Sequence, residues 1–158
     1  MEKQKRAFVF GKAEKIDESA FLSTLNIQKI EGNVGNLVYR YAISKHFDCK
    51  KDVVGWGTSL DTINKSGEIG VIQGANQLGS HIDYKNLSEH FSQFECNLVL
   101  IGLGAQSTHD MAIPKIPVGT LNWINEIIRR KPAKVPNISV RGEFTQRVLD
   151  QYGFQNNS

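Results

Sequence analysis

The chain has 158 residues, enough for one domain with a buried core but too few for two domains of ordinary size. Hydrophobic residues make up 40% of it and charged residues 22%, values typical of a globular domain rather than a disordered chain. Nineteen Lys and Arg against sixteen Asp and Glu leave a mildly basic net charge of +3.

The one dense basic run predicts the end of a helix and not a nucleic-acid surface. It comprises Arg129, Arg130, Lys131 and Lys134. Cations at a helix C-terminus interact favourably with the helix dipole, which favours a structural role for the run. No aromatic residues are interleaved with it, so we expect no nucleic-acid partner.

Cysteine use and apolar segments indicate a cytoplasmic protein. Cys49 and Cys96 are the only cysteines and form no C-x-x-C pair, so we expect neither a disulfide scaffold nor a metal site. The apolar run after the charged N-terminus covers only Ala7–Phe10, too short for the core of a signal peptide. No segment approaches the roughly 20 apolar residues of a membrane span.

The N-terminal part of the chain is the hardest to interpret, above all residues 1–30. The elements predicted there are strand candidates at residues 8–10 and 25–30, a helix at 36–47, a short strand at 52–56 and turns through Gly67. Of the two strand candidates, 25–30 is better placed because it leads into a glycine-rich motif. The helix is predicted because its apolar residues recur at helical spacing.

From residue 68 onward, strands and helices alternate clearly. The predicted elements are strands at 68–73, 97–101 and 137–140, helices at 84–94, 120–130 and 143–152, a loop at 108–118 and a helix-ending Gly153. The continuous apolar run at 97–101 is typical of an inner strand buried on both faces. The alternation predicts one α/β domain over residues 1–158, a Rossmann-like three-layer domain with a mainly parallel sheet.

Four short motifs rich in Gly, Asn, Gln and Arg each follow a predicted strand. They are residues 32–36 (GNVGN), 73–77 (QGANQ), 102–107 (GLGAQS) and 140–143 (VRGE). Ligands of open α/β sheets bind beyond the carboxyl ends of the strands, so we expect a pocket there for a small anion or a sugar. The side chains expected to gather in it are Asn33, Asn36, Asn76, Gln106 and Arg141.

Each motif also has a simpler interpretation. Residues 32–36 fit an ordinary turn with an Asn N-cap, which spacing alone favours. Arg141 could form a surface ion pair with Glu143 or another neighbouring carboxylate, although its place after a strand favours a guanidinium that binds carboxylate or phosphate. The third glycine of a dinucleotide fingerprint is missing from residues 102–107, and His109 is best explained as a solvated loop histidine.

In this order and spacing, the motifs resemble the polysaccharide pyruvyl transferase family. The resemblance covers about residues 30–153, and its matching segments are 32–47, 72–77, 97–106 and 138–143 with the helix that follows. It implies the N-terminal half of a GT-B-type enzyme whose active site lies between two Rossmann-like domains. Such enzymes transfer pyruvate from phosphoenolpyruvate, the donor substrate, to a saccharide acceptor in exopolysaccharide biosynthesis, without a cofactor.

The resemblance also implies roles for individual residues. Arg141 matches the family arginine that helps to hold phosphoenolpyruvate, which fits the need of phosphate and carboxylate for fixed positive charge. Asn36 stands where family members commonly carry an acid, and an amide cannot transfer a proton at neutral pH. The catalytic residue is therefore unknown.

The resemblance places further anion-binding residues in a C-terminal domain that this chain does not contain. We therefore expect an incomplete active site in these 158 residues, with the missing domain as a partner. Two other interpretations stay open. One is a non-catalytic Rossmann-like module that binds a sugar or a partner protein, and the other is the acceptor domain of a GT-B glycosyltransferase.

Overall fold

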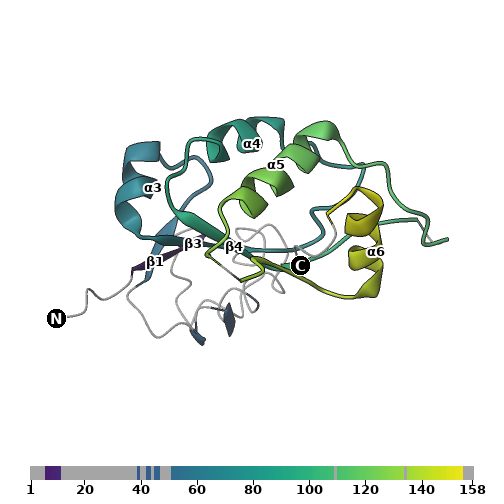
Figure 1. Cartoon of the computed structure of the whole chain (residues 1–158), viewed down its shortest axis with the longest axis horizontal. Coiled ribbons are helices and arrows are strands. Elements are labelled where there is room, and N and C mark those ends of the chain that lie inside the picture. The colour runs from purple at the N-terminus through teal and green to yellow at the C-terminus, as the bar shows by residue number, and fades with distance from the viewer. Residues whose placement is uncertain are drawn as a thin grey trace, which may run out of the picture.

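The computed structural model describes residues 6–11, 39, 42–43, 45–46, 51–108, 110–133 and 135–154. Over these residues the fold is α/β, with a five-stranded, all-parallel sheet and four helices (Figure 1). The strands are β1 (Ala7–Phe10), β2 (Lys51–Val54), β3 (Ile69–Gln73), β4 (Asn97–Leu103) and β5 (Ile138–Val140). The helices are α3 (Leu60–Ser66), α4 (Lys85–Phe91), α5 (Val118–Arg129) and α6 (Glu143–Gln151). The predicted Rossmann-like α/β class is confirmed.

The strand order in the sheet is β2-β1-β3-β4-β5. β4 therefore lies between two neighbours, which confirms that the apolar run at 97–101 is an inner strand. β1 pairs with β2 on one side and with β3 on the other. From β1 the chain adds β2 on one side of the sheet and then returns to add β3, β4 and β5 on the other side. The boundary between β1 and β3 is therefore the topological switch point, where ligands of open α/β sheets bind.

Apolar side chains cover both faces of the sheet because successive residues of a strand point to opposite sides. Phe8 and Phe10 pack into the main core below α3, α4 and α5, which lie along one side of the sheet in Figure 1. Val9 and Val71 point to the other face and pack against Ile43, one of the described helical residues. The arrangement gives three layers.

The N-terminal part differs most from the expectation. The weaker strand candidate, residues 8–10, is the central strand β1, whereas the candidate at 25–30 lies outside the described residues. Within the predicted helix 36–47, Tyr39, Ala42, Ile43 and Lys45 are helical and His46 lies in a turn, and the other residues lie outside the described part of the chain.

The prediction of turns through Gly67 is wrong, because α3 occupies residues 60–66. Its start carries the usual signal, since the Ser59 side chain accepts a hydrogen bond from the Thr62 N–H. An exposed Asp61–Lys65 ion pair spans one turn further along. Only Ile63 of its apolar residues is fully buried, so the hydrophobic pattern of α3 is too sparse to mark a helix.

The end of α6 confirms the prediction for Gly153. Its φ of 84° is left-handed, the conformation that glycine adopts most readily. The Phe154 N–H donates to the Leu149 carbonyl and the Gly153 N–H to the Asp150 carbonyl, at 3.0 Å each. These two bonds are the Schellman pattern, and the buried Phe154 adds its usual apolar contact.

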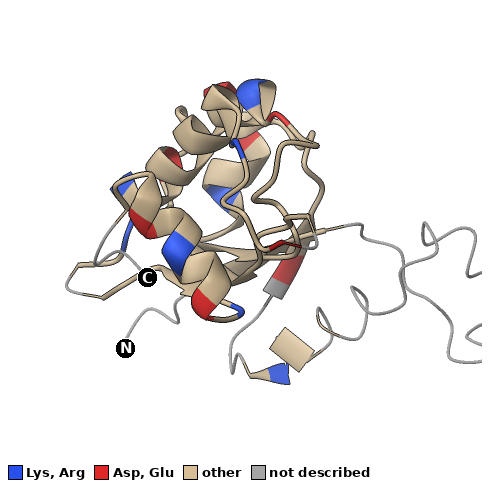
Figure 2. Ribbon diagram, turned by 90° about the vertical axis from the view of Figure 1, so that its right-hand side faces the viewer, with Lys and Arg blue, Asp and Glu red and all other residues tan. Residues whose placement is uncertain are grey.

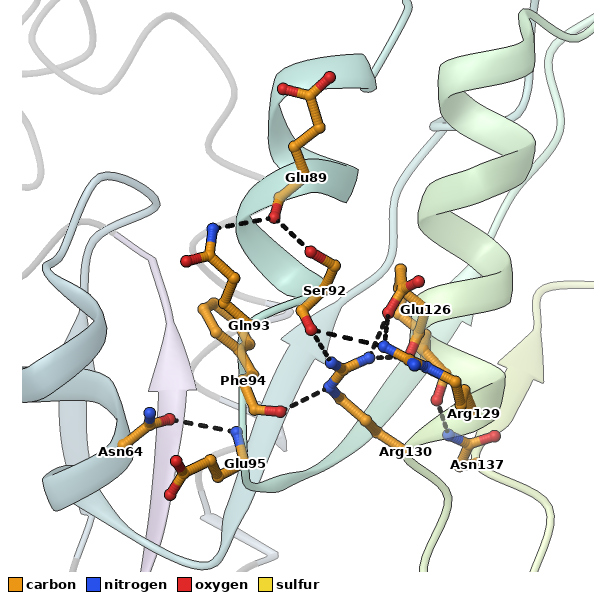
Figure 3. Close-up of polar contacts among 11 residues, drawn as sticks. Asn64, Glu89, Ser92, Gln93, Phe94, Glu95, Glu126, Arg129, Arg130 and Asn137 are labelled. Atoms are coloured by element: carbon orange, nitrogen blue, oxygen red, sulfur yellow. Dashed lines mark hydrogen bonds and ion pairs between the residues drawn. The ribbon is translucent and has the colours of Figure 1, made fainter.

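The basic run at the end of α5 contains a structural arginine. The Arg130 side chain is only 10% exposed and donates to the carbonyls of Ser92 (2.6 Å) and Phe94 (2.9 Å), just after α4 (Figure 3). It also pairs with Glu126 one turn earlier in α5. Arg130 therefore fastens the end of α4 to α5.

Charged residues elsewhere are mixed. Basic and acidic residues alternate along the helices in the view of Figure 2 instead of gathering by sign. Of the helices that the structure describes, none has the length and apolar character needed to cross a membrane.

Candidate functional site

A cavity of about 570 Å³ lies at the switch point, beyond the carboxyl ends of β1 and β3. Phe10 and Gly11 border it from the end of β1, and residues 73–75 with Gln77 border it from the end of β3. We call it the switch-point cavity. Its position agrees with the general rule for ligand sites in open α/β sheets.

Aromatic rings form most of its remaining wall. Trp56, which follows β2, stacks on Phe10 with ring centroids 5.2 Å apart, and Tyr84, which precedes α4, contacts Trp123 of α5 at 4.9 Å. Burial raises the pKa of the Tyr84 phenol. Tyr39 and Leu87 complete the lining.

A buried threonine sets the positions of Tyr84 and Trp123. The Thr120 hydroxyl accepts a hydrogen bond from the Tyr84 N–H at 3.2 Å and donates to the Ile82 carbonyl at 2.9 Å. Trp123 lies one turn further along α5. The loop before α4 is thereby held against the helix that carries the indole.

Two residues that border the cavity have a buried donor without a hydrogen-bond partner among the described residues. Neither the Nε2 group of Gln73 nor the indole Nε1 of Trp123 has a hydrogen-bond partner among the described residues. An unpaired buried polar group costs about 1–3 kcal/mol, so a ligand acceptor that met either group would recover part of that energy. The Gln77 amide is already used, because it bonds to the Ala75 N–H and the Gln73 carbonyl and so holds the turn after β3.

A second cluster lies beside the cavity, where the loops after β3 and β4 touch. The Gly74 N–H donates to the Ile101 carbonyl at 2.6 Å, and the Gly104 N–H donates to the Ala75 carbonyl at 2.7 Å. A Cβ atom on Gly74 would lie 2.4 Å from the Leu103 nitrogen. The two loops can approach this closely only because residue 74 has no side chain.

Arg141 belongs to this cluster. Its Nε donates to the Gly102 carbonyl at 3.0 Å and its Nη2 to the Gly74 carbonyl at 3.4 Å, while its guanidinium lies 5.6 Å from the centroid of the Tyr39 ring. No carboxylate in the described part of the chain forms an ion pair with it. The expected alternative, a pair with Glu143, is therefore not what the structure contains.

The five predicted site residues have different outcomes. Asn76 and Arg141 come together, since a Cβ on Gly104 would lie 2.9 Å from Asn76 Oδ1 and 3.3 Å from Arg141 Cδ. Gln106 is exposed, and its N–H donates to the Leu78 carbonyl at 2.7 Å, which ties its loop to the one that carries Asn76. Asn33 and Asn36 lie outside the described residues, as does His109.

The sequence interpretation missed the aromatic wall. Trp56, Tyr84 and Trp123 come from three separate elements, and each one alone is indistinguishable from a core aromatic. Gln73 was part of a motif, but its unpaired amide becomes visible only when its surroundings are known.

The described residues contain no group of three His, Cys, Asp or Glu side chains placed to hold a metal ion. The chain matches no known family model, no curated protein and no solved structure. The candidate function therefore depends on the geometry of the site and on the motifs of the sequence.

Proposed function

We propose that this chain is the Rossmann-like half of a polysaccharide pyruvyl transferase-like enzyme. The complete enzyme would transfer pyruvate from phosphoenolpyruvate to a sugar of a cell-surface polysaccharide. The observation that carries the proposal is the environment of Arg141, a guanidinium held at the carboxyl edge of the sheet without a carboxylate partner among the described residues.

The contacts of Arg141 suit an anion site. The two side-chain hydrogen bonds of Arg141 to described residues go to neutral backbone carbonyls, so they orient the guanidinium without neutralising its charge. Its Nη1 group forms no hydrogen bond with a described residue. Helix α6 begins at Glu143, two residues later, so its first N–H groups add positive potential nearby.

A binding experiment tests the role of Arg141. We expect Arg141→Ala to weaken phosphoenolpyruvate binding to the full chain by about 2 kcal/mol, close to thirtyfold, as for a lost charge-assisted bond. Arg141→Lys restores binding only in part, because an ammonium keeps the charge but not the planar fork. Isothermal titration calorimetry with phosphoenolpyruvate measures each affinity.

Arg147 provides the matched control. It lies on α6, is exposed and stacks on Phe144, so Arg147→Ala removes one positive charge without touching the glycine loops. We expect its phosphoenolpyruvate affinity to equal that of the unmodified chain. Equal affinities for Arg141→Ala and the unmodified chain would remove Arg141 from the site.

A non-catalytic sugar-binding module is the second candidate, favoured by the uncharged aromatic lining of the switch-point cavity. An activity assay separates the two. On the first proposal the remaining anion-binding residues belong to a second domain, so we expect no pyruvyl transfer by the 158-residue chain alone. Adding that domain restores transfer if the chain is half of an enzyme, and does nothing if it is a binding module.

A further inference from the structure

The switch-point cavity has an uncharged lining. Its polar side chains are two glutamines and two tyrosines, and none of the described residues that border it is acidic or basic. Arg141 contacts Gly74 and Tyr39, which border the cavity, but does not border it itself. Hydrogen-bonding groups without charge therefore make up the polar part of the described lining, which suits an uncharged ligand.

The shape of the wall favours a ring. Phe10 and Trp56 stack on each other, and Tyr84 with Trp123 supplies a second pair of faces. Aromatic faces bind flat or ring-shaped ligands by stacking and exclude water from them. The volume, about 570 Å³, lies within the range of small-molecule sites.

The unpaired groups define what the ring must carry. An indole N–H can only donate, so the partner that Trp123 lacks is an acceptor. Trp123 is also 1% exposed, which places this donor in a dry environment where a hydrogen bond is strong. Gln73, which also borders the cavity, adds a second buried donor without a partner among the described residues.

From these three observations we infer that the switch-point cavity is a binding site for an uncharged ring that carries acceptor oxygens. Saccharides and nucleosides share this chemistry, and a titration with each distinguishes them. The saccharide arm of the inference rests on the second candidate function, a sugar-binding module, and names its site. The inference is independent of the first candidate, because a neutral ring can bind here whether or not Arg141 holds an anion.

Tryptophan fluorescence reports directly on the cavity. The chain has two tryptophans, Trp56 and Trp123, and both border the cavity, so emission changes on binding arise there without background from elsewhere. The full chain is titrated separately with methyl glucoside, uridine, phosphoenolpyruvate and inorganic phosphate. We expect a saturable change with methyl glucoside or with uridine, and the one that binds identifies the ligand class.

Single substitutions assign the binding to the unpaired donors. Trp123→Phe keeps an aromatic face but removes the N–H, and we expect it to weaken the neutral ligand about tenfold, read from Trp56 emission. Arg147→Ala is the control, because Arg147 lies on α6 and does not border the cavity; we expect less than about a threefold change. If Trp123→Phe fails to fold by circular dichroism, Gln73→Met removes the other donor at similar side-chain length.

Two results would overturn the inference. The first is no saturable response to either neutral probe. The second is a fluorescence response to phosphate or phosphoenolpyruvate that exceeds the response to both neutral probes and persists in Arg141→Ala. Loss of phosphoenolpyruvate binding in Arg141→Ala with neutral-ring binding unchanged supports separate sites. Failure of the anion site alone leaves this inference intact.

Discussion

Gly102 connects the sheet to the candidate anion site. It lies in an irregular part of β4, where Leu100 and Leu103 pair with Ile138 and Val140, so β4 has one residue more than β5 across the same stretch. Its φ of 73° is left-handed, as expected for a glycine in a β-bulge. The bulge orients the Gly102 carbonyl so that it accepts a hydrogen bond from Arg141 Nε.

We therefore expect Gly102→Ala to be strongly destabilising. A side chain there is strained by the positive φ, and its Cβ would lie 1.8 Å from the Tyr39 hydroxyl oxygen, so Tyr39 must move. The strain alone is worth roughly 1–3 kcal/mol of unfolding free energy. Urea denaturation of the variant measures the loss.

Gly142→Ala is the matched control for Gly102→Ala. The backbone at Gly142 is extended and a Cβ there meets nothing within 4 Å, so we expect a change within about 0.5 kcal/mol. Similar losses for both variants would show that residue 102 does not adopt the left-handed conformation in solution.

The sequence allowed part of the site to be predicted, for a physical reason. Asn76 and Arg141 each follow a strand, and parallel strands end at one edge, so their proximity follows from topology alone. The cavity wall could not be predicted in this way. Trp123 reaches it from within a helix, and only tertiary packing brings that helix against Tyr84.

At the element scale, Arg130 and Arg129 are adjacent in sequence but differ in environment. Arg130 is nearly buried and donates to two backbone carbonyls beyond α4, whereas the Arg129 side chain is 62% exposed (Figure 3). We expect Arg130→Ala to lower the unfolding free energy by about 2–3 kcal/mol, since bonds from a charged donor are lost and the Phe94 carbonyl loses its arginine partner. Thermal and urea melts check this value.

Arg129→Ala gives the comparison. Its ion pair with Glu126 is at the surface, where such pairs are worth about 0–1 kcal/mol, and its bond to the Ser92 carbonyl is long at 3.4 Å, so we expect a small effect. If the two alanine variants melt alike, Arg130 does not hold α4 to α5.

The elements themselves were predictable to different degrees. β4 and α5 have long apolar patterns, and their positions were predicted to within a few residues. α3 was missed because its stability comes from capping and from one buried isoleucine. β1 is four residues long, so the strength of its pattern gave no hint that it lies at the centre of the sheet.

At the scale of the whole molecule, the raised pKa of Tyr84 predicts how stability changes with pH. Burial disfavours the phenolate, so the folded chain holds the phenol proton more tightly than the unfolded chain does. This contribution is present below the ordinary tyrosine pKa of 10.0 and is lost as pH rises through the higher folded value.

We therefore expect the unfolding free energy to fall as pH rises above about 10, and to fall less in Tyr84→Phe, which has no ionisable group there. Urea denaturation of both proteins at pH values below and above 10 measures the difference. At about pH 7 the phenol is protonated in both states, so that pH serves as the internal control. An equal fall in both proteins would contradict a buried Tyr84 phenol.

The central position of β1 has a consequence for the order of folding. β3, α4, β4, α5 and β5 follow one another along the chain, and each strand of this group pairs with the next in sequence. β1 has no such neighbour, since its partners begin at Lys51 and Ile69. The chain must close long loops before β1 is held on either side, which delays its contacts relative to the β3–β5 unit. Because β1 also borders the switch-point cavity, the cavity is completed among the last parts of the molecule, and ligand binding selects the fully assembled sheet.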